Sequence, residues 1–139
     1  MRRKVFQTLA TLGMAIVLFP AAALAADLDG KASLVCASID VVGCANGPGC
    51  HEGSADEFDL PQFLFVDFEK QHVHGTDETG IDVVSEVRNS EITEEQIILQ
   101  GIENHRGWTM TIDRGDGDMT LSSSGAGVSF MIFGACTRR

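Results

Sequence analysis

The sequence predicts a mostly β protein, a small antiparallel barrel or sandwich of about seven to eight strands that is linked by disulfides. Two observations carry this prediction. Short stretches in which apolar and polar residues alternate are separated by clusters of turn residues, and no stretch has the period of an amphipathic helix of ordinary length. The chain also contains 4 cysteines, an even number that suits disulfide bonding.

The first 25 residues are typical of a cleaved signal peptide. A basic start at residues 2–4 precedes an apolar run over residues 5–19, and Ala23-Leu24-Ala25 is a small-x-small cleavage pattern. The apolar run is shorter than the ~20 residues that a membrane-spanning helix needs. We therefore expect an exported protein, periplasmic or secreted, with one β domain over residues 26–139 and no membrane span after cleavage.

The charge of the mature chain would be strongly negative. Three of the 10 basic residues leave with the signal peptide, so seven would remain against 20 acidic ones, a net charge of −13. Such a surface repels nucleic acid and favours basic partners by steering, although solubility alone also explains it. We expect no nucleic-acid partner, a basic periplasmic protein or a small ligand as the partner, and a monomer.

Four cysteines in an exported chain predict two disulfides, for which three pairings exist. The favoured pairing joins Cys44 to Cys50 around a short loop, and Cys36 to Cys136 between the first and last strands. In the chain-entropy account the longer link contributes ~4–5 kcal/mol. A bond between the terminal strands favours a closed barrel, since closure removes both sheet edges.

Two extended segments are expected in the first half of the domain. Residues 31–42 form the first strand, with Val35, Ala37, Ile39 and Val41 on one face. Residues 43–53 are rich in turn residues. Residues 62–74 read as one long segment that places Asp67 and Glu69 on the face opposite to His72 and His74.

The second half is expected to hold strands at 81–88 and 96–103 and a closing three-stranded meander at 107–136, with a short helical turn at 90–95. In the meander, Trp108, Met110 and Ile112 alternate with polar residues. Asp116-Gly117 predicts a hairpin turn, because these residues tolerate positive φ.

The most suggestive metal-binding pattern is His72-Val73-His74. Residues two apart on a strand point to the same side, so both imidazoles could contact one metal ion. Further ligands are needed, and Asp77 and Glu78 supply one only if the following turn folds back. The alternative interpretation is two surface histidines at the end of a strand.

The acidic turn near residue 115 offers a second, weaker metal-binding pattern. Asp113, Asp116 and Asp118 cluster there, but the spacing is not that of an EF-hand, and a tight hairpin needs Asp and Gly for conformational reasons. Cys44, Cys50 and His51 do not have the C-x-x-C-H spacing of haem attachment. We expect no cofactor.

Catalysis has little support in the sequence. No G-x-S-x-G motif occurs, and the serines at 122–124 lie in a predicted turn. We therefore expect a protein that is not an enzyme. The candidates for ligand binding are Trp108, which is the only tryptophan, Phe63 and Phe65. For Trp108 the alternative role is packing in the core.

Four parts of the sequence carry a resemblance: the cysteine loop, LPQFLFVDFEK, LQGIENHRGWTMTID and FMIFGAC. Together they look like a family of small exported proteobacterial proteins without an assigned function. The resemblance implies a periplasmic, disulfide-bonded, mostly β protein.

A looser architectural likeness is to the periplasmic C-type lysozyme inhibitors, although this chain lacks a clear copy of their Ser- and Lys-bearing inhibitory loops. We expect a binding or inhibitory module of unknown ligand. The alternative is a metal-binding periplasmic protein that uses His72 and His74.

Overall fold

The computed structural model describes residues 28–76, 80 and 82–139, and almost all of them form β structure. The predicted signal peptide lies outside these residues. The elements are β1 (Leu34–Ala45), β2 (Gly49–Gly53), the 3₁₀ turn η1 (Asp56–Phe58), β3 (Phe63–Asp67), β4 (His72–Thr76), β5 (Asp82–Ile92), β6 (Gln96–Glu103), β7 (Arg106–Asp113), β8 (Asp118–Gly125) and β9 (Val128–Arg138). None of the described residues belongs to a helix with the length and hydrophobicity needed to cross a bilayer.

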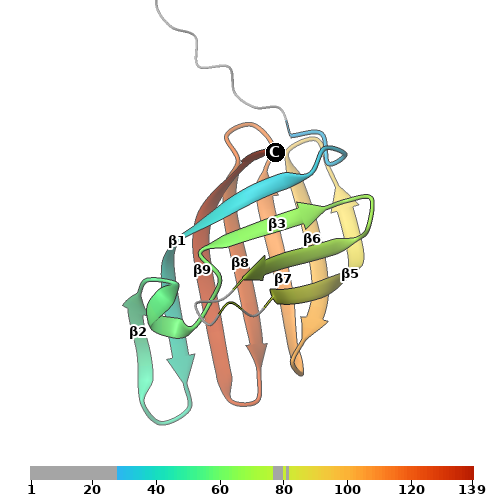
Figure 1. The fold of residues 1–139 in the computed structure, drawn as a ribbon. Helices are drawn as coiled ribbons and strands as arrows, with labels where there is room; N and C mark the ends of the chain where they lie inside the picture. Colours follow the sequence, from blue (N-terminus) through green and yellow to red (C-terminus); the bar gives the residue numbers. More distant parts are fainter. Residues whose placement is uncertain (1–27, 77–79, 81) are drawn as a thin grey trace, which may run out of the picture.

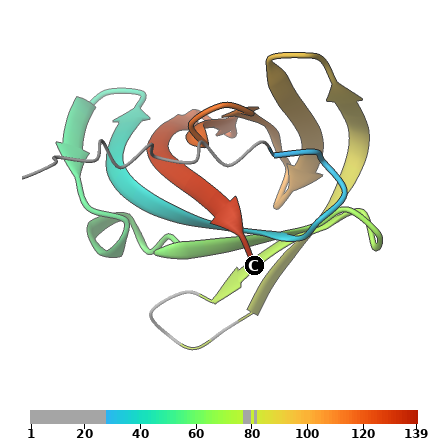
Figure 2. The ribbon, with the colours of Figure 1, turned by 90° about the horizontal axis from the view of Figure 1, so that it is seen from above.

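The strands form one antiparallel sheet that closes on itself (Figures 1 and 2). Its order is β2-β1-β3-β4-β5-β6-β7-β8-β9, and an additional pairing of β1 with β9 completes an eight-stranded barrel. β2 is the extra strand and forms a hairpin with the lower half of β1 in Figure 1. The sequence left a barrel and a sandwich as alternatives, and the structure is a barrel.

Two disulfides cross-link strands of the sheet, and their pairing is the one that the sequence favoured. Cys36 and Cys136 face each other in the register of β1 and β9, with a sequence separation of 100. Cys44 and Cys50 face each other across the β1–β2 hairpin, with a separation of 6. Disulfides are typical of chains that fold in an oxidising compartment.

The interior of the barrel holds the hydrophobic core, because alternate residues of each strand point inward. The closing meander follows its predicted phase: Trp108, Met110 and Ile112 are buried, and Met119 is buried on the next strand. Gly117 takes φ +84° in the predicted turn. The fully buried large side chains are Leu28, Leu34, Val41, Val66, Ile97, Leu99, Met110, Ile112 and Met119.

The predicted face of the first strand is wrong. The register of β1 against β9 shifts between Ser38 and Asp40, which is a β-bulge at Ile39. Ile39 is therefore 60% exposed, and the inward residues are Cys36 before the bulge and Val41 after it. One extra residue changed the phase that strict alternation predicts.

The expectation of one long segment over residues 62–74 is also wrong, because the chain reverses between β3 and β4. The Asp67 carboxylate accepts a hydrogen bond from the Lys70 amide at 2.9 Å, and Gln71 takes φ +56°. The reversal pairs Asp67 with His72 in register. Asp67 therefore lies beside His72 on the outer face, not on the opposite one.

The expected helical turn at 90–95 is absent from these residues, which the structure describes in full. β5 continues to Ile92 and β6 begins at Gln96. The hydroxyl of Thr93 closes the connection by accepting hydrogen bonds from the amides of Glu95 and Gln96, at 3.3 and 2.9 Å. In β5, Ser85 and Val87 are buried and share the inner face. Ile81, the first residue of the predicted strand, lies outside the described residues.

The two ends of the barrel are built differently. At the upper end in Figure 1, which we call the closed end, residues 28–33 run across the barrel to the turns at 93–95 and 114–117. Leu28 is fully buried there, and its amide donates to the carbonyl of Arg114 at 3.1 Å. The lower end, the open end, is formed by residues 59–61 and the turns at 104–105 and 126–127.

Candidate functional site: a cavity at the open end of the barrel

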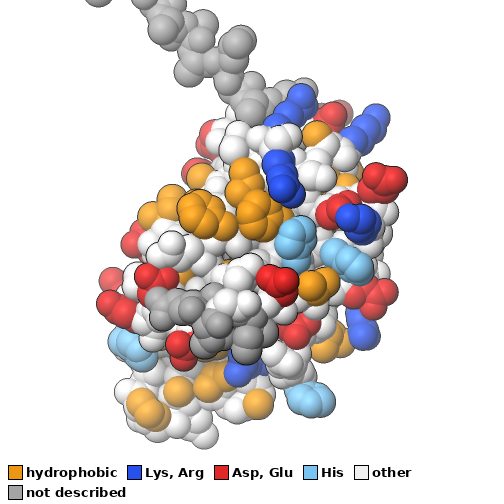
Figure 3. All heavy atoms as spheres, viewed as in Figure 1, with side chains coloured by type: hydrophobic (Ala, Val, Ile, Leu, Met, Phe, Trp, Pro, Cys, Tyr) orange, Lys and Arg blue, Asp and Glu red, His pale blue; other side chains and the backbone are white. Residues whose placement is uncertain are grey.

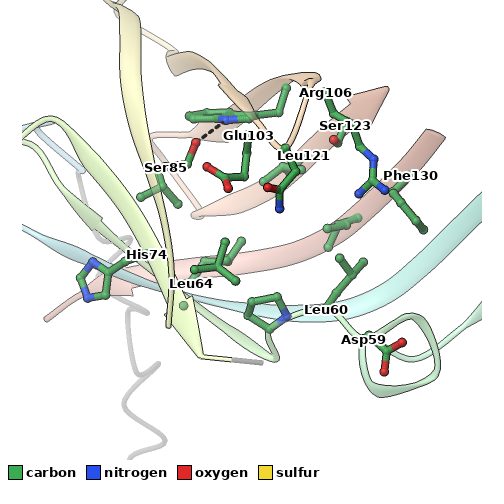
Figure 4. A pocket seen from close by; sticks show the side chains of 17 residues that line it. Asp59, Leu60, Leu64, His74, Ser85, Glu103, Arg106, Leu121, Ser123 and Phe130 are labelled. Carbon is green, nitrogen blue, oxygen red and sulfur yellow. Dashed lines mark hydrogen bonds between the residues drawn. The ribbon is translucent and has the colours of Figure 1, made fainter. Parts of the chain in front are cut away.

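A cavity of about 210 Å³ lies at the open end, inside the ring of strands (Figure 4). Its lining comes from β3, β4, β5, β8, β9, the β6–β7 hairpin and residues 59–61. Most of its wall is apolar, with Leu60, Pro61, Leu64, Val73, Leu121 and Ile132 among the lining residues. Such a wall favours an apolar occupant over bulk water.

Trp108 forms one wall of the cavity and is fixed by a single polar contact. Its indole Nε1–H donates to the hydroxyl of Ser85 at 2.7 Å, and both side chains are buried. Gly101 faces Trp108 in the register of β6 and β7, and a Cβ at that position would overlap the indole ring. The glycine thus makes the space that the indole occupies.

Residues 55–61 partly cover the open end. Phe58 stacks on His51 of the β1–β2 hairpin, with 4.8 Å between ring centroids, and meets Phe130 edge to face at 5.9 Å. The Leu60 amide donates to the carbonyl of Ala55 at 3.0 Å. That hydrogen bond lies within the segment. Its aromatic contacts and the Ser38 hydroxyl of β1, which donates to the Pro61 carbonyl at 3.1 Å, anchor the segment to the barrel, so that Leu60 lines the edge of the cavity.

The polar side chains of the cavity include Arg106, Glu103 and Ser123. The guanidinium carbon of Arg106 lies 5.6 Å from the centroid of the Phe130 ring, a cation–π contact that stabilises its positive charge. The Nε–H of Arg106 is buried and has no hydrogen-bond acceptor in the part of the chain that the structure describes. Glu103 faces Arg106 in register, but no ion pair joins these two described residues.

The structure places the predicted aromatic candidates in two different regions. Trp108 lines the cavity, whereas Phe63 and Phe65 lie on the outer face of β3. Phe65 stacks on His74 with 5.2 Å between ring centroids, and Phe63 is 53% exposed. Hydrophobic side chains gather on this outer face (Figure 3), where Ile39 is also exposed.

His72 and His74 both lie on the outer face of β4, as the spacing predicts. Figure 4 shows the His74 side chain pointing away from the cavity. In register, His72 has Asp67 on one side and Glu86 on the other. Among the described residues, however, no group of three or more His, Cys, Asp or Glu side chains is arranged to hold a metal ion, and Asp77 and Glu78 lie outside them. Metal binding by the histidines stays a prediction.

The acidic turn around residue 115 has a conformational explanation. One carboxylate oxygen of Asp113 accepts hydrogen bonds from the amides of Gly115 and Asp116, at 2.7 and 3.3 Å. Asp116 accepts from the amide of Asp118 at 3.0 Å. The hydrogen bond from Gly115, followed by that from Asp116, lowers the pKa of Asp113 below its usual value. These contacts are what a tight turn requires.

The sequence analysis did not single out Arg106, Ser85 or Glu103 as site residues. A signal was present, since Arg106 is in phase with the buried Trp108 and Met110 of the same strand. A charged residue that continues an inward-facing apolar row is unusual, because burying a charge without a partner costs free energy. This signal can be interpreted only when it is known which end of the barrel is open.

The chain was compared with models of protein families, with curated proteins and with solved structures, and none of them matches it.

Proposed function

We propose that this protein is a binding module that holds one small, mostly apolar molecule in the cavity at the open end of the barrel. The observation that carries the proposal is the combination of an apolar wall with an open rim. The wall offers hydrophobic contact, and Trp108 offers a large flat surface for packing. Ser85 is already engaged by the indole, which leaves the other polar groups to orient a ligand.

The size of the cavity limits the ligand. An apolar cavity of about 150 Å³ accommodates benzene, and the cavity here measures about 210 Å³. One six-membered ring with a short substituent therefore fits. Larger molecules would have to extend beyond the rim toward residues 59–61.

The two disulfides support an exported protein, and we propose that it binds its ligand in the periplasm. No catalytic step is part of the proposal. The protein would store, carry or sense its ligand.

A pair of neighbouring substitutions on β5 tests the proposal. Val83 lines the cavity, whereas Val84 is 52% exposed on the outer face. We expect cyclohexanol and benzyl alcohol to change the fluorescence of Trp108 in a saturable manner. Val83→Phe should fill the cavity and weaken this binding at least tenfold, and Val84→Phe should leave it unchanged.

Two results would count against a binding cavity. One is the absence of a saturable response for either alcohol in the parent protein. The other is an equal loss of binding in both variants, which would mean that the alcohols act on the surface or on overall stability.

A further inference from the structure

We infer that the cavity selects a ligand with a single carboxylate group, which Arg106 binds. This inference rests on the proposed function and adds the chemical class of the ligand to it.

The Arg106 side chain is the one described group at the cavity that is cationic at all ordinary pH values. Its half-buried guanidinium lies beside Phe130 and close to Ser123 in Figure 4. Burial of an arginine needs compensation, and among the described residues the guanidinium has the cation–π contact with Phe130 but no hydrogen bond or ion pair. The charge is thus held in position without being neutralised.

The hydrogen-bonding capacity of this guanidinium is incomplete. The Nε–H has no acceptor among the described residues. A guanidinium binds a carboxylate through two parallel N–H groups, of which Nε–H is commonly one. Since the Nε–H is buried, the side chain must rotate for this geometry to form. A carboxylate would then supply the acceptor that the protein lacks.

The acidic neighbours restrict the charge of the ligand. Glu103 and Asp59 also line the cavity, and neither forms an ion pair with Arg106. Both carboxylates repel an anion, so the single guanidinium can offset the charge of one ligand carboxylate, and a second carboxylate is disfavoured. The remaining wall is apolar, so the rest of the ligand should be a hydrocarbon ring or a short chain.

The experiment compares two ligands of the same shape, cyclohexanecarboxylate and its neutral amide, by isothermal titration calorimetry. We expect the parent protein to bind the carboxylate at least about tenfold more tightly, as two charge-assisted hydrogen bonds predict. Arg106→Gln should reduce carboxylate affinity to that of the amide, and Arg106→Lys should lie between. Arg88→Gln makes the same change of charge at an exposed position outside the cavity and should have no effect.

The outcomes separate the two proposals. If the amide binds and the carboxylate binds no better, or if Arg106→Gln leaves the preference intact, the inference about Arg106 is wrong while the binding cavity stands. If neither compound binds the parent, the binding cavity and this inference are both wrong. The comparison within the parent protein needs no variant, so it remains decisive even if Arg106→Gln folds poorly.

Discussion

The two ends of the barrel each contain an arginine, and these two side chains are used in opposite ways. At the closed end, Arg114 donates from Nε to the Leu28 carbonyl at 2.7 Å and from Nη1 to the Thr93 carbonyl at 2.7 Å. At the open end, the Nε–H of Arg106 has no hydrogen-bond acceptor among residues 28–76, 80 and 82–139. An arginine that joins three segments is structural, whereas a half-buried arginine beside a cavity, with a buried Nε–H that lacks an acceptor among the described residues, is suited to a ligand.

The same contrast holds for the apolar residues. Leu28 is fully buried and fills the closed end. Leu60, at the corresponding place in the open end, is only half-buried and lines the cavity. Leu28 is therefore closely packed at one end of the barrel, whereas Leu60 borders a cavity at the other, and regions that bind ligands are commonly less tightly packed than the core.

The largest expected effect concerns the two disulfides, one near each end. Replacing Cys36 and Cys136 by serine opens a link with a sequence separation of 100, whereas the Cys44–Cys50 link has a separation of 6. The chain-entropy account gives losses of about 4–5 and about 2 kcal/mol respectively. Urea unfolding of the two double variants measures both losses. Equal losses would mean that chain entropy does not account for the difference.

Truncation of one leucine at each end gives the next effect. Leu28→Ala should lower the free energy of unfolding by about 2–5 kcal/mol, because it leaves a cavity in a fully packed region. Leu60→Ala should cost about 1 kcal/mol, since its side chain is half-buried and borders an existing space. A larger loss for Leu60→Ala, measured by the same unfolding experiment, would contradict the assignment of the two ends.

A smaller effect is expected inside the cavity. Ser85→Ala leaves the buried indole Nε1–H of Trp108 without its acceptor, which should cost about 1–3 kcal/mol and shift the Trp108 emission. Ser123→Ala is the matched control, because Ser123 lines the same cavity and has no hydrogen bond to the indole. Thermal unfolding with fluorescence detection compares them. The same stability in both variants would show that the Ser85 contact is dispensable.

The smallest effect concerns pH and should appear away from the cavity. Backbone hydrogen bonds lower the pKa of Asp29, Asp67 and Asp113 below the ordinary value of 3.8. Asp29 and Asp113 lie in or beside the segments that form the closed end, Asp67 lies at the β3–β4 reversal, and none of the three lines the cavity. A carboxylate whose pKa is lower in the folded state stabilises the protein at pH values above its ordinary pKa. This contribution is lost as the pH falls through the pKa of the folded state.

Amide hydrogen exchange at acid pH checks this expectation. The amides of Lys31, Lys70 and Gly115, which donate to these carboxylates, should lose protection below about pH 4. The amide of Leu60 at the open end, which donates to a carbonyl, serves as the reference. Greater protection of the three amides on acidification would contradict this expectation.

Sequence reasoning predicted the fold well where local signals dominate. The closing meander has strict alternation and an Asp-Gly turn, and the structure follows both. It failed at Ile39, where a bulge is imposed by pairing with a distant strand, and at residues 68–71, where the chain reverses without Gly, Pro or Asn. These features depend on tertiary partners that the local sequence does not contain.

The candidate site was predictable only in part. Trp108 was identified because a single tryptophan on an inward-facing strand is conspicuous. Phe63 and Phe65 were placed with it because all three are aromatic, but the pleat directs the phenylalanines outward. Arg106 became interpretable only once the open end and the orphaned Nε–H were known.

The most direct test of a ligand site confined to the open end is a titration of the ¹⁵N-labelled protein with cyclohexanecarboxylate, followed by two-dimensional NMR. We predict saturable shifts of the Trp108 indole N–H and of the Ser85, Arg106 and Ser123 amides, with little change at Leu28 and Arg114. Shifts that are absent, that never saturate, or that are largest at the closed end would contradict the account.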